Sequence, residues 1–196
     1  MVQMLRCVVM VGLLATVGLE ARADLLEFGD FQEWSDAVGG DFTTIDFTGF
    51  PDATFITDQY EDLGVLFLDG DDNVFCCDDI TYPNDGSGLD GNSAIELEFT
   101  QPMSWIAADF PGGLAFELYF EGELIAESTF FAGGGVGFFA GIISDQPFDR
   151  ATLFDWIDGF VFLDDLHFGP PIPAPGALPL LGGAALLLGR LRRRRR

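Results

Sequence analysis

Basic residues are almost missing from this chain of 196 residues: it has no lysine, and its one histidine is His167. Arginine occurs at Arg6, Arg22 and Arg150, and otherwise only in a cluster at the end of the chain. A transition-metal centre needs several His or Cys ligands, and a serine-type triad needs a histidine base near a nucleophile motif, so neither is expected. Nucleic acid and anionic lipid are excluded as partners of the acidic part, because both would be repelled.

Cysteine is also scarce, with Cys7 near the start and Cys76 and Cys77 side by side. Adjacent cysteines cannot join distant loops, so the fold must depend on its hydrophobic core rather than on a disulfide framework. A strained vicinal disulfide, an intermolecular bridge and two free thiols all stay open for this pair.

The first 23 residues have the three parts of a secretory signal peptide. Arg6 supplies the basic start, and residues 8–19 form an apolar run that is too short for a lasting membrane span. Ala21 and Ala23 then give the small-x-small pattern that signal peptidase accepts. We expect cleavage after Ala23 and a mature chain that begins at Asp24, with an uncleaved anchor or a buried strand as the alternatives.

Residues 24–169 are predicted to be the exported domain. They hold 31 acidic residues against Arg150 alone, which gives a formal charge of −30. Such a charge favours solubility, but it also pushes the compact state apart. Bound divalent cations or a salty habitat would offset this repulsion.

The pattern within this domain predicts a mainly β fold with one short helix. Residues 30–38 have the spacing of an amphipathic helix, with Asp30 as its cap and Gly39 after its end. Later segments alternate apolar and polar residues between Gly, Pro and Asp turns, which is typical of an antiparallel β-sandwich of jelly-roll type. The expected strands are residues 44–47, 64–68, 94–99, 103–110, 114–120, 123–129, 136–143, 150–156 and 160–168.

The end of the chain has a different composition. Residues 170–176 are rich in proline and form a stiff spacer, and residues 177–191 are apolar except for Arg190. As a helix of about 22 Å, this hydrophobic segment is shorter than the roughly 30 Å of a bilayer core. The arginines of residues 192–196 stay on the cytoplasmic side, so the domain is expected outside and the tail is a short transmembrane segment.

This tail resembles the PEP-CTERM sorting signal. A Pro-x-Pro motif is followed by a short apolar helix with small residues at 178–188 and by a terminal arginine cluster; Ala174 stands where the family name has glutamate. The resemblance implies export across the inner membrane of a Gram-negative bacterium that makes extracellular polysaccharide, and processing by an exosortase near the proline motif. The residues concerned are Pro173, Ala174, Pro175, Arg192, Arg193, Arg194, Arg195 and Arg196.

An aspartate-rich segment is the best candidate for a metal site. Asp69, Asp71 and Asn73 stand at alternate positions, as oxygen ligands of calcium do, and Asp78 and Asp79 follow closely. Val74 replaces the turn glycine of an EF-hand and Ile80 replaces its bidentate glutamate, which excludes that motif. A calcium site in a β domain, or simply a solvated acidic loop, fits the pattern. Asp164 and Asp165 beside the last strand form a second, weaker candidate.

The aromatic residues offer one candidate for ligand binding. Trp34 and Trp105 fall in apolar patterns and are expected in the core, whereas Trp156 lies at a turn between Asp155 and Asp158. An exposed Trp156 would suit stacking on a sugar ring, and ordinary packing is its alternative.

These observations lead to one expected function and two alternatives. We expect an exported, non-enzymatic cell-surface or extracellular-matrix protein that binds polysaccharide with the help of calcium. Its precursor meets signal peptidase, exosortase and the inner membrane only in transit. The alternatives are a small extracellular glycan hydrolase, for which no carboxylate pair stands out, and an architectural coat protein without a ligand.

Overall fold

The computed structural model describes residues 22–40, 42–68, 73–76, 87–131, 137–157 and 159–171, with the backbone alone for residues 73–76. Most of the predicted signal peptide therefore lies outside the described residues, as do residues 69–72 and 77–86 and everything from residue 172 onward.

Ten strands and one α-helix make up the described part of the chain, together with a short 3-10 turn at Glu61–Leu63. All strand pairs are antiparallel, and the principal order is β4-β5-β10-β6-β9-β7-β8. The elements are β1 (Leu25–Phe28), α1 (Phe31–Val38), β2 (Thr43–Ile45), β3 (Val65–Leu68), β4 (Asn73–Cys76), β5 (Gly88–Gly91), β6 (Ile95–Phe110), β7 (Gly113–Phe120), β8 (Glu123–Phe131), β9 (Phe138–Phe154) and β10 (Val161–Gly169).

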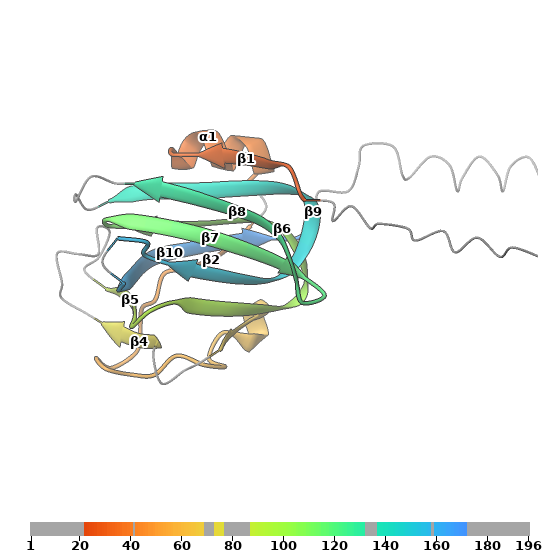
Figure 1. The fold of residues 1–196 in the computed structure, drawn as a ribbon. Helices are drawn as coiled ribbons and strands as arrows, with labels where there is room; N and C mark the ends of the chain where they lie inside the picture. The colour runs from red at the N-terminus through yellow and green to blue at the C-terminus, as the bar shows by residue number, and fades with distance from the viewer. Residues whose placement is uncertain are drawn as a thin grey trace, which may run out of the picture.

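The two long strands β6 and β9 form the spine of the sheet, and each changes its outer neighbour along its length. The first half of β6 pairs with β3 and its second half with β10. In the same way, the first half of β9 pairs with β1 and its second half with β7. Figure 1 shows the resulting curled sheet, with α1 and β1 lying above its upper strands.

The spine bends where β6 and β9 each contain a proline. The β6–β9 register is interrupted between Glu98 and Met103 and again between Met103 and Trp105. Pro102 lies in the first interruption, and Pro147 lies just before Phe148, the partner of Met103. Since proline has no N–H to give to the ladder, these bulges accommodate it without ending either strand.

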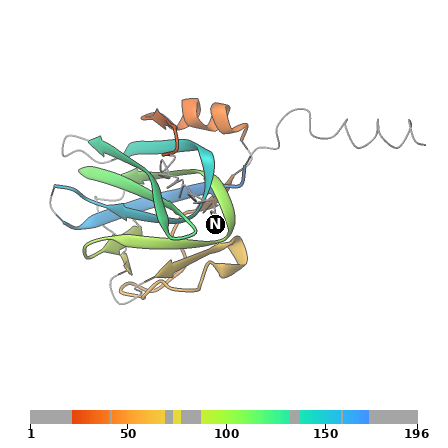
Figure 2. The same cartoon turned by 45° about the vertical axis from the view of Figure 1, so that its right-hand side comes forward.

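The helix forms as its capping pattern predicts. The backbone N–H of Glu33 donates to Asp30 Oδ1 at 2.9 Å, and Gly39 ends the helix with a φ of 82°. Trp34 and Val38 are its buried residues, and they face β9. A Cβ on Gly141 would lie 2.6 Å from Trp34 Cδ1, so glycine allows the helix to approach the sheet closely. Figure 2 shows the helix, in orange, above the uppermost strands in a second view.

Two apolar clusters fill the two faces of this region. Along β6, Ile106, Ala108 and Phe110 point into the main core, while Trp105 and Ala107 point toward α1. The smaller cluster under the helix contains Trp34, Val38, Trp105, Ala107 and Phe139. Both clusters draw on residues between Ala23 and Phe168, so we expect residues 24–171 to fold as an independent unit.

The mainly β fold, its antiparallel pairing and its single helix are thus confirmed for the described residues. Two predicted strand breaks are wrong: residues 95–110 form one strand and residues 138–154 form another, because the prolines produce bulges instead of ends. Three short strands, β1, β4 and β5, were not predicted. The predicted hairpin around Glu121 and Gly122 is present between β7 and β8.

Candidate functional site

Trp156 lies at the surface beside the end of β8. Half of its side chain is exposed (51%), and Phe131, the last residue of β8, is exposed to 65%. The two ring centroids are 6.1 Å apart with planes inclined by 59°. Ile157 follows at 45% exposure, and we call these three residues, Phe131, Trp156 and Ile157, the Trp156 patch.

The turn that carries the patch is held in place by several contacts. Trp156 Nε1 donates to the backbone oxygen of Phe130 at 3.2 Å, which fixes the orientation of the indole against β8. The N–H of Ile157 donates to Asp155 Oδ1 at 2.6 Å, closing a tight turn. A Cβ on Gly113 would lie 2.8 Å from Ile157 Cδ1 and 2.9 Å from Asp155 Oδ1, so the turn rests directly on the start of β7. The site is therefore preorganised rather than loose.

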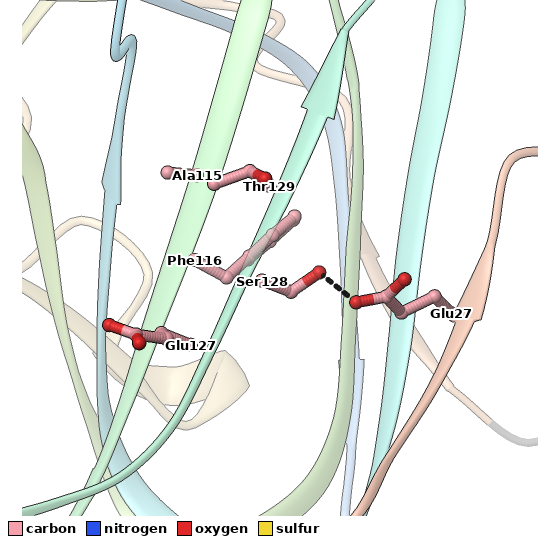
Figure 3. A pocket seen from close by; sticks show the side chains of 6 residues that line it. All are labelled: Glu27, Ala115, Phe116, Glu127, Ser128 and Thr129. Carbon is pink, nitrogen blue, oxygen red and sulfur yellow. Dashed lines mark hydrogen bonds between the residues drawn. The ribbon is translucent and has the colours of Figure 1, made fainter.

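A hollow of about 370 Å³ lies between β1, β7 and β8. Ser128 Oγ donates to Glu27 Oε1 at 2.6 Å across it, as Figure 3 shows. Glu127 points away from Glu27 in this view and forms an exposed ion pair with Arg22 at 3.5 Å. The residues that line the hollow are Glu27, Ala115, Phe116, Glu127, Ser128 and Thr129.

This hollow lacks the environment that a glycoside hydrolase gives to its acid. A general acid needs a carboxyl group that burial keeps protonated at neutral pH, paired with a second carboxylate across the bond to be cut. Both Glu27 and Glu127 are exposed to water. The hollow therefore presents its two carboxylates as exposed hydrogen-bond acceptors.

The carboxylates of the last strand lie in an irregular part of β10. Asp164 is 1% exposed and stands opposite Asp109 of β6, and the register shifts between Asp164 and His167. Asp165 has a φ of 45°, and its N–H donates to Asp164 Oδ1 at 2.9 Å. Asp164 is thus buried and Asp165 only partly so, because neighbouring residues of a strand point to opposite faces of the sheet.

Of the predicted calcium ligands, Asp69, Asp71, Asp78 and Asp79 lie outside the described residues, and Asn73 is described by its backbone in β4. Within the ranges that the structure describes, no group of three or more His, Cys, Asp or Glu side chains is placed to hold a metal ion. The calcium site at these residues, and the weaker one at Asp164 and Asp165, stay predictions.

His167 belongs to the aromatic cluster under α1. It is 5% exposed, and its Nδ1 lies 2.9 Å from Thr44 Oγ1. The rings of Phe31, Trp34 and Phe42 lie 5.2 to 5.7 Å from the imidazole, centroid to centroid. Burial lowers the pKa of His167 to about 4, so the ring is neutral at pH 7. This environment makes it a packing residue of the small cluster.

The predicted cleavage residue Ala23 is partly buried and packs against the main core, whereas Ala21 lies outside the described residues. The sorting motif, Pro173 to Pro175, and the arginine cluster also lie outside them. No helix in the described ranges is long and apolar enough to span a membrane.

In comparisons with protein-family models, with curated proteins and with solved structures, the chain matches none. The site must therefore be judged by its own geometry.

Sequence reasoning identified Trp156 but missed its surroundings. Phe131 ends a strand that was expected to finish at residue 129, and nothing in the local sequence connects it with Trp156. The contact depends on the β7–β8 hairpin and on β9, which returns the chain beside β7. The hollow beside Glu27 was missed for a similar reason, because β1 itself was not predicted.

Proposed function

We propose that this protein is exported across the inner membrane of a Gram-negative bacterium, processed at its tail by an exosortase, and retained at the cell surface or in the extracellular matrix. There it acts as a non-enzymatic binder of neutral polysaccharide. The order of basic start, apolar run and Ala21-x-Ala23 supports export. The Pro-x-Pro motif, short apolar segment and arginine cluster support the sorting step.

The fold that we propose for the domain is a β-sandwich of jelly-roll type. The bend of β6 and β9 at Pro102 and Pro147 supports it, because each long strand then serves two groups of neighbours. One large core cluster draws side chains from both groups, as expected for two layers that face each other.

The observation that carries the binding proposal is the exposed and fixed pair of Trp156 and Phe131. The flat face of a sugar ring carries weakly positive C–H groups, which match the negative face of an aromatic ring. Because Trp156 is already held by the Phe130 carbonyl, little conformational entropy is lost when a sugar stacks on it.

The negative charge of the domain favours a neutral polysaccharide as the ligand. The domain carries 31 acidic residues against a single arginine, so an anionic polysaccharide would be repelled unless cations bridged the two. The same negative charge makes two copies of the domain repel each other, which opposes dimerisation through the Trp156 patch. Calcium bound by the aspartate-rich segment from Asp69 onward is the proposed helper, because it would reduce the repulsion among the domain's own carboxylates.

The decisive variant is Trp156→Ala, compared with Phe55→Ala as a matched control that is also 51% exposed. In affinity electrophoresis through gels containing neutral glucans or galactans, the protein should be retarded. The Trp156 variant should bind about tenfold more weakly, and the control should bind as the parent does. Retardation that is equal in all three proteins, or absent in the parent, contradicts the proposal and favours the coat-protein alternative.

The sorting proposal has a separate test in an exosortase-containing host. Replacing the arginines of residues 192–196 with serine removes the charge that keeps the end of the tail cytoplasmic. We expect the precursor to accumulate. Arg190 remains in this variant and should support partial processing at most. A substitution of Arg22 serves as the control outside the tail. Normal maturation of the serine variant would overturn the sorting account.

A further inference from the structure

Asp24, the expected first residue of the mature chain, is held at both ends of its backbone by Asp145. The backbone nitrogen of Asp24 donates to Asp145 Oδ1 at 2.9 Å. The backbone nitrogen of Asp145 donates in turn to the carbonyl oxygen of Asp24 at 3.2 Å. Asp145 follows Ser144, the β9 partner of Leu25, so the backbone bond extends the β1–β9 ladder by one residue and the side-chain bond reinforces it.

The two residues before Asp24 are attached to β8 instead of β9. The N–H of Ala23 donates to the carbonyl oxygen of Ile125 at 2.8 Å. Arg22 forms an ion pair with Glu127 at 3.5 Å, with side chains 69% and 57% exposed, and water screens a pair of this kind strongly. Cleavage after Ala23 removes both residues, and with them the two contacts that precede β1.

We propose that the same cleavage supplies β1 with a replacement, an ion pair between the new α-ammonium group of Asp24 and the carboxylate of Asp145. Hydrolysis adds water across the Ala23–Asp24 bond. Ala23 leaves with the new carboxylate, and the nitrogen of Asp24 becomes an ammonium group at neutral pH. That nitrogen already lies 2.9 Å from the acceptor oxygen. The inference rests on the export step of the proposed function.

The change converts a neutral donor into a charged one without moving the chain. A hydrogen bond in which both partners are ionised is shorter and stronger than one with a neutral N–H. The new cation also enters a domain in which Arg150 is otherwise the sole basic residue apart from His167. Asp145 is thus a positioned receptor for the processed N-terminus.

The test combines two N-termini with two substitutions. Domains of residues 24–171 and 22–171 are released from a cleavable fusion so that each begins at its native residue. Asp145→Asn removes the charge but keeps an oxygen that accepts a peptide N–H. Asp149→Asn is the matched control, because Asp149 lies on the same strand and accepts the ordinary peptide N–H of Glu121 at 3.0 Å.

We expect Asp145→Asn to lower the thermal midpoint by about 2 °C relative to Asp149→Asn when the chain begins at Asp24. The same variant should also speed acylation of the terminal amine about threefold, because the free amine becomes more available. In the domain that begins at Arg22, the two substitutions should have equal effects. Equal effects in both domains would overturn the ion pair.

The premise is tested separately by sequencing the N-terminus of the full chain after export. A start at Asp24 supports the processing step, and any other start overturns it. Raising the pH above about 10 should abolish the specific effect of Asp145→Asn, because the terminal amine is then neutral. Persistence of that effect at high pH would contradict the pairing.

Discussion

At the scale of single residues, His167 links the packing of α1 to pH. Its ring lies among Phe31, Trp34 and Phe42 from the helix and the segment after it. The one hydrogen-bond partner that the described residues give it is the hydroxyl of Thr44. A charged imidazole in this apolar cluster would have to be solvated or expelled, and either change would disturb the helix.

Acid should therefore weaken the fold through His167. Its pKa is lowered from 6.5 to about 4, so between these values the unfolded chain takes up the proton first. The contribution of the neutral ring to the free energy of unfolding is complete above pH 6.5 and is lost as the pH falls toward 4. The loss is on the order of 3 kcal/mol at most.

Urea unfolding of the parent and of His167→Leu at pH 7, 5.5 and 4.5 measures this effect. The carboxylates titrate in both proteins, so the difference between them isolates the histidine. The free energy of unfolding of the parent should fall more steeply below pH 6.5 than that of the variant. Parallel curves would show that the imidazole does not contribute.

The three tryptophans show how much of a residue's environment follows from its neighbours in the sequence. Trp34 and Trp105 were expected in the core from their apolar patterns, and they are 0% and 3% exposed. Trp156, flanked by aspartates, was the candidate for exposure with ordinary packing as its alternative, and it is half exposed. Their partners were not predictable in this way, because Phe131 and Gly141 reach them from other strands.

At the scale of elements, α1 depends on its cap. Asp30→Ala removes the acceptor for the N–H of Glu33 and should cost about 1 kcal/mol, whereas Asp30→Asn should retain most of the stability. Asp36→Ala is the control on the same helix, because it removes a carboxylate and an exposed side-chain bond from Gln32 at 2.8 Å but leaves the cap intact. Thermal unfolding measured by circular dichroism compares the three variants. Equal midpoints for Asp30→Ala and Asp36→Ala would rule out a role for the cap.

The helix and the β7–β8 hairpin were predictable because their signals are local. Cap, apolar spacing and terminal glycine all lie within ten residues for the helix, and Glu121-Gly122 marks the hairpin turn. Strands β1 and β5 have no such signal. β5 has the sequence Gly-Leu-Asp-Gly, which is unfavourable for a strand, and it forms because β10 and β4 flank it.

At the scale of the whole molecule, charge is the dominant feature. The domain must hold 31 carboxylate-bearing residues together with very few cations. One contact that lowers this repulsion is the ion pair between Arg150 and Glu96 at the centre of the sheet, where β9 lies against β6. A single pair offsets only a small part of such a charge.

Calcium should therefore stabilise the domain beyond its effect on ionic strength. Millimolar calcium chloride should raise the thermal midpoint more than sodium chloride of equal ionic strength, since a bound ion adds its binding free energy to the folded state. Asp69→Asn combined with Asp71→Asn should remove the difference, and Asp52→Asn with Asp58→Asn is a control of equal charge outside the predicted site. Equal midpoints in the two salts would leave screening as the whole effect.

The position of β10 has a consequence for the time at which the domain can form. Among the described strands it is the last to be synthesised, yet it lies in the interior of the sheet, between β6 on one side and β5 and β2 on the other. Until it emerges, residues 105–109 of β6 pair with β9 alone and lack their second neighbour, so the N-terminal part cannot complete its sheet first. The sheet is therefore completed only after residues 161–169 have been made, which is near the end of the domain.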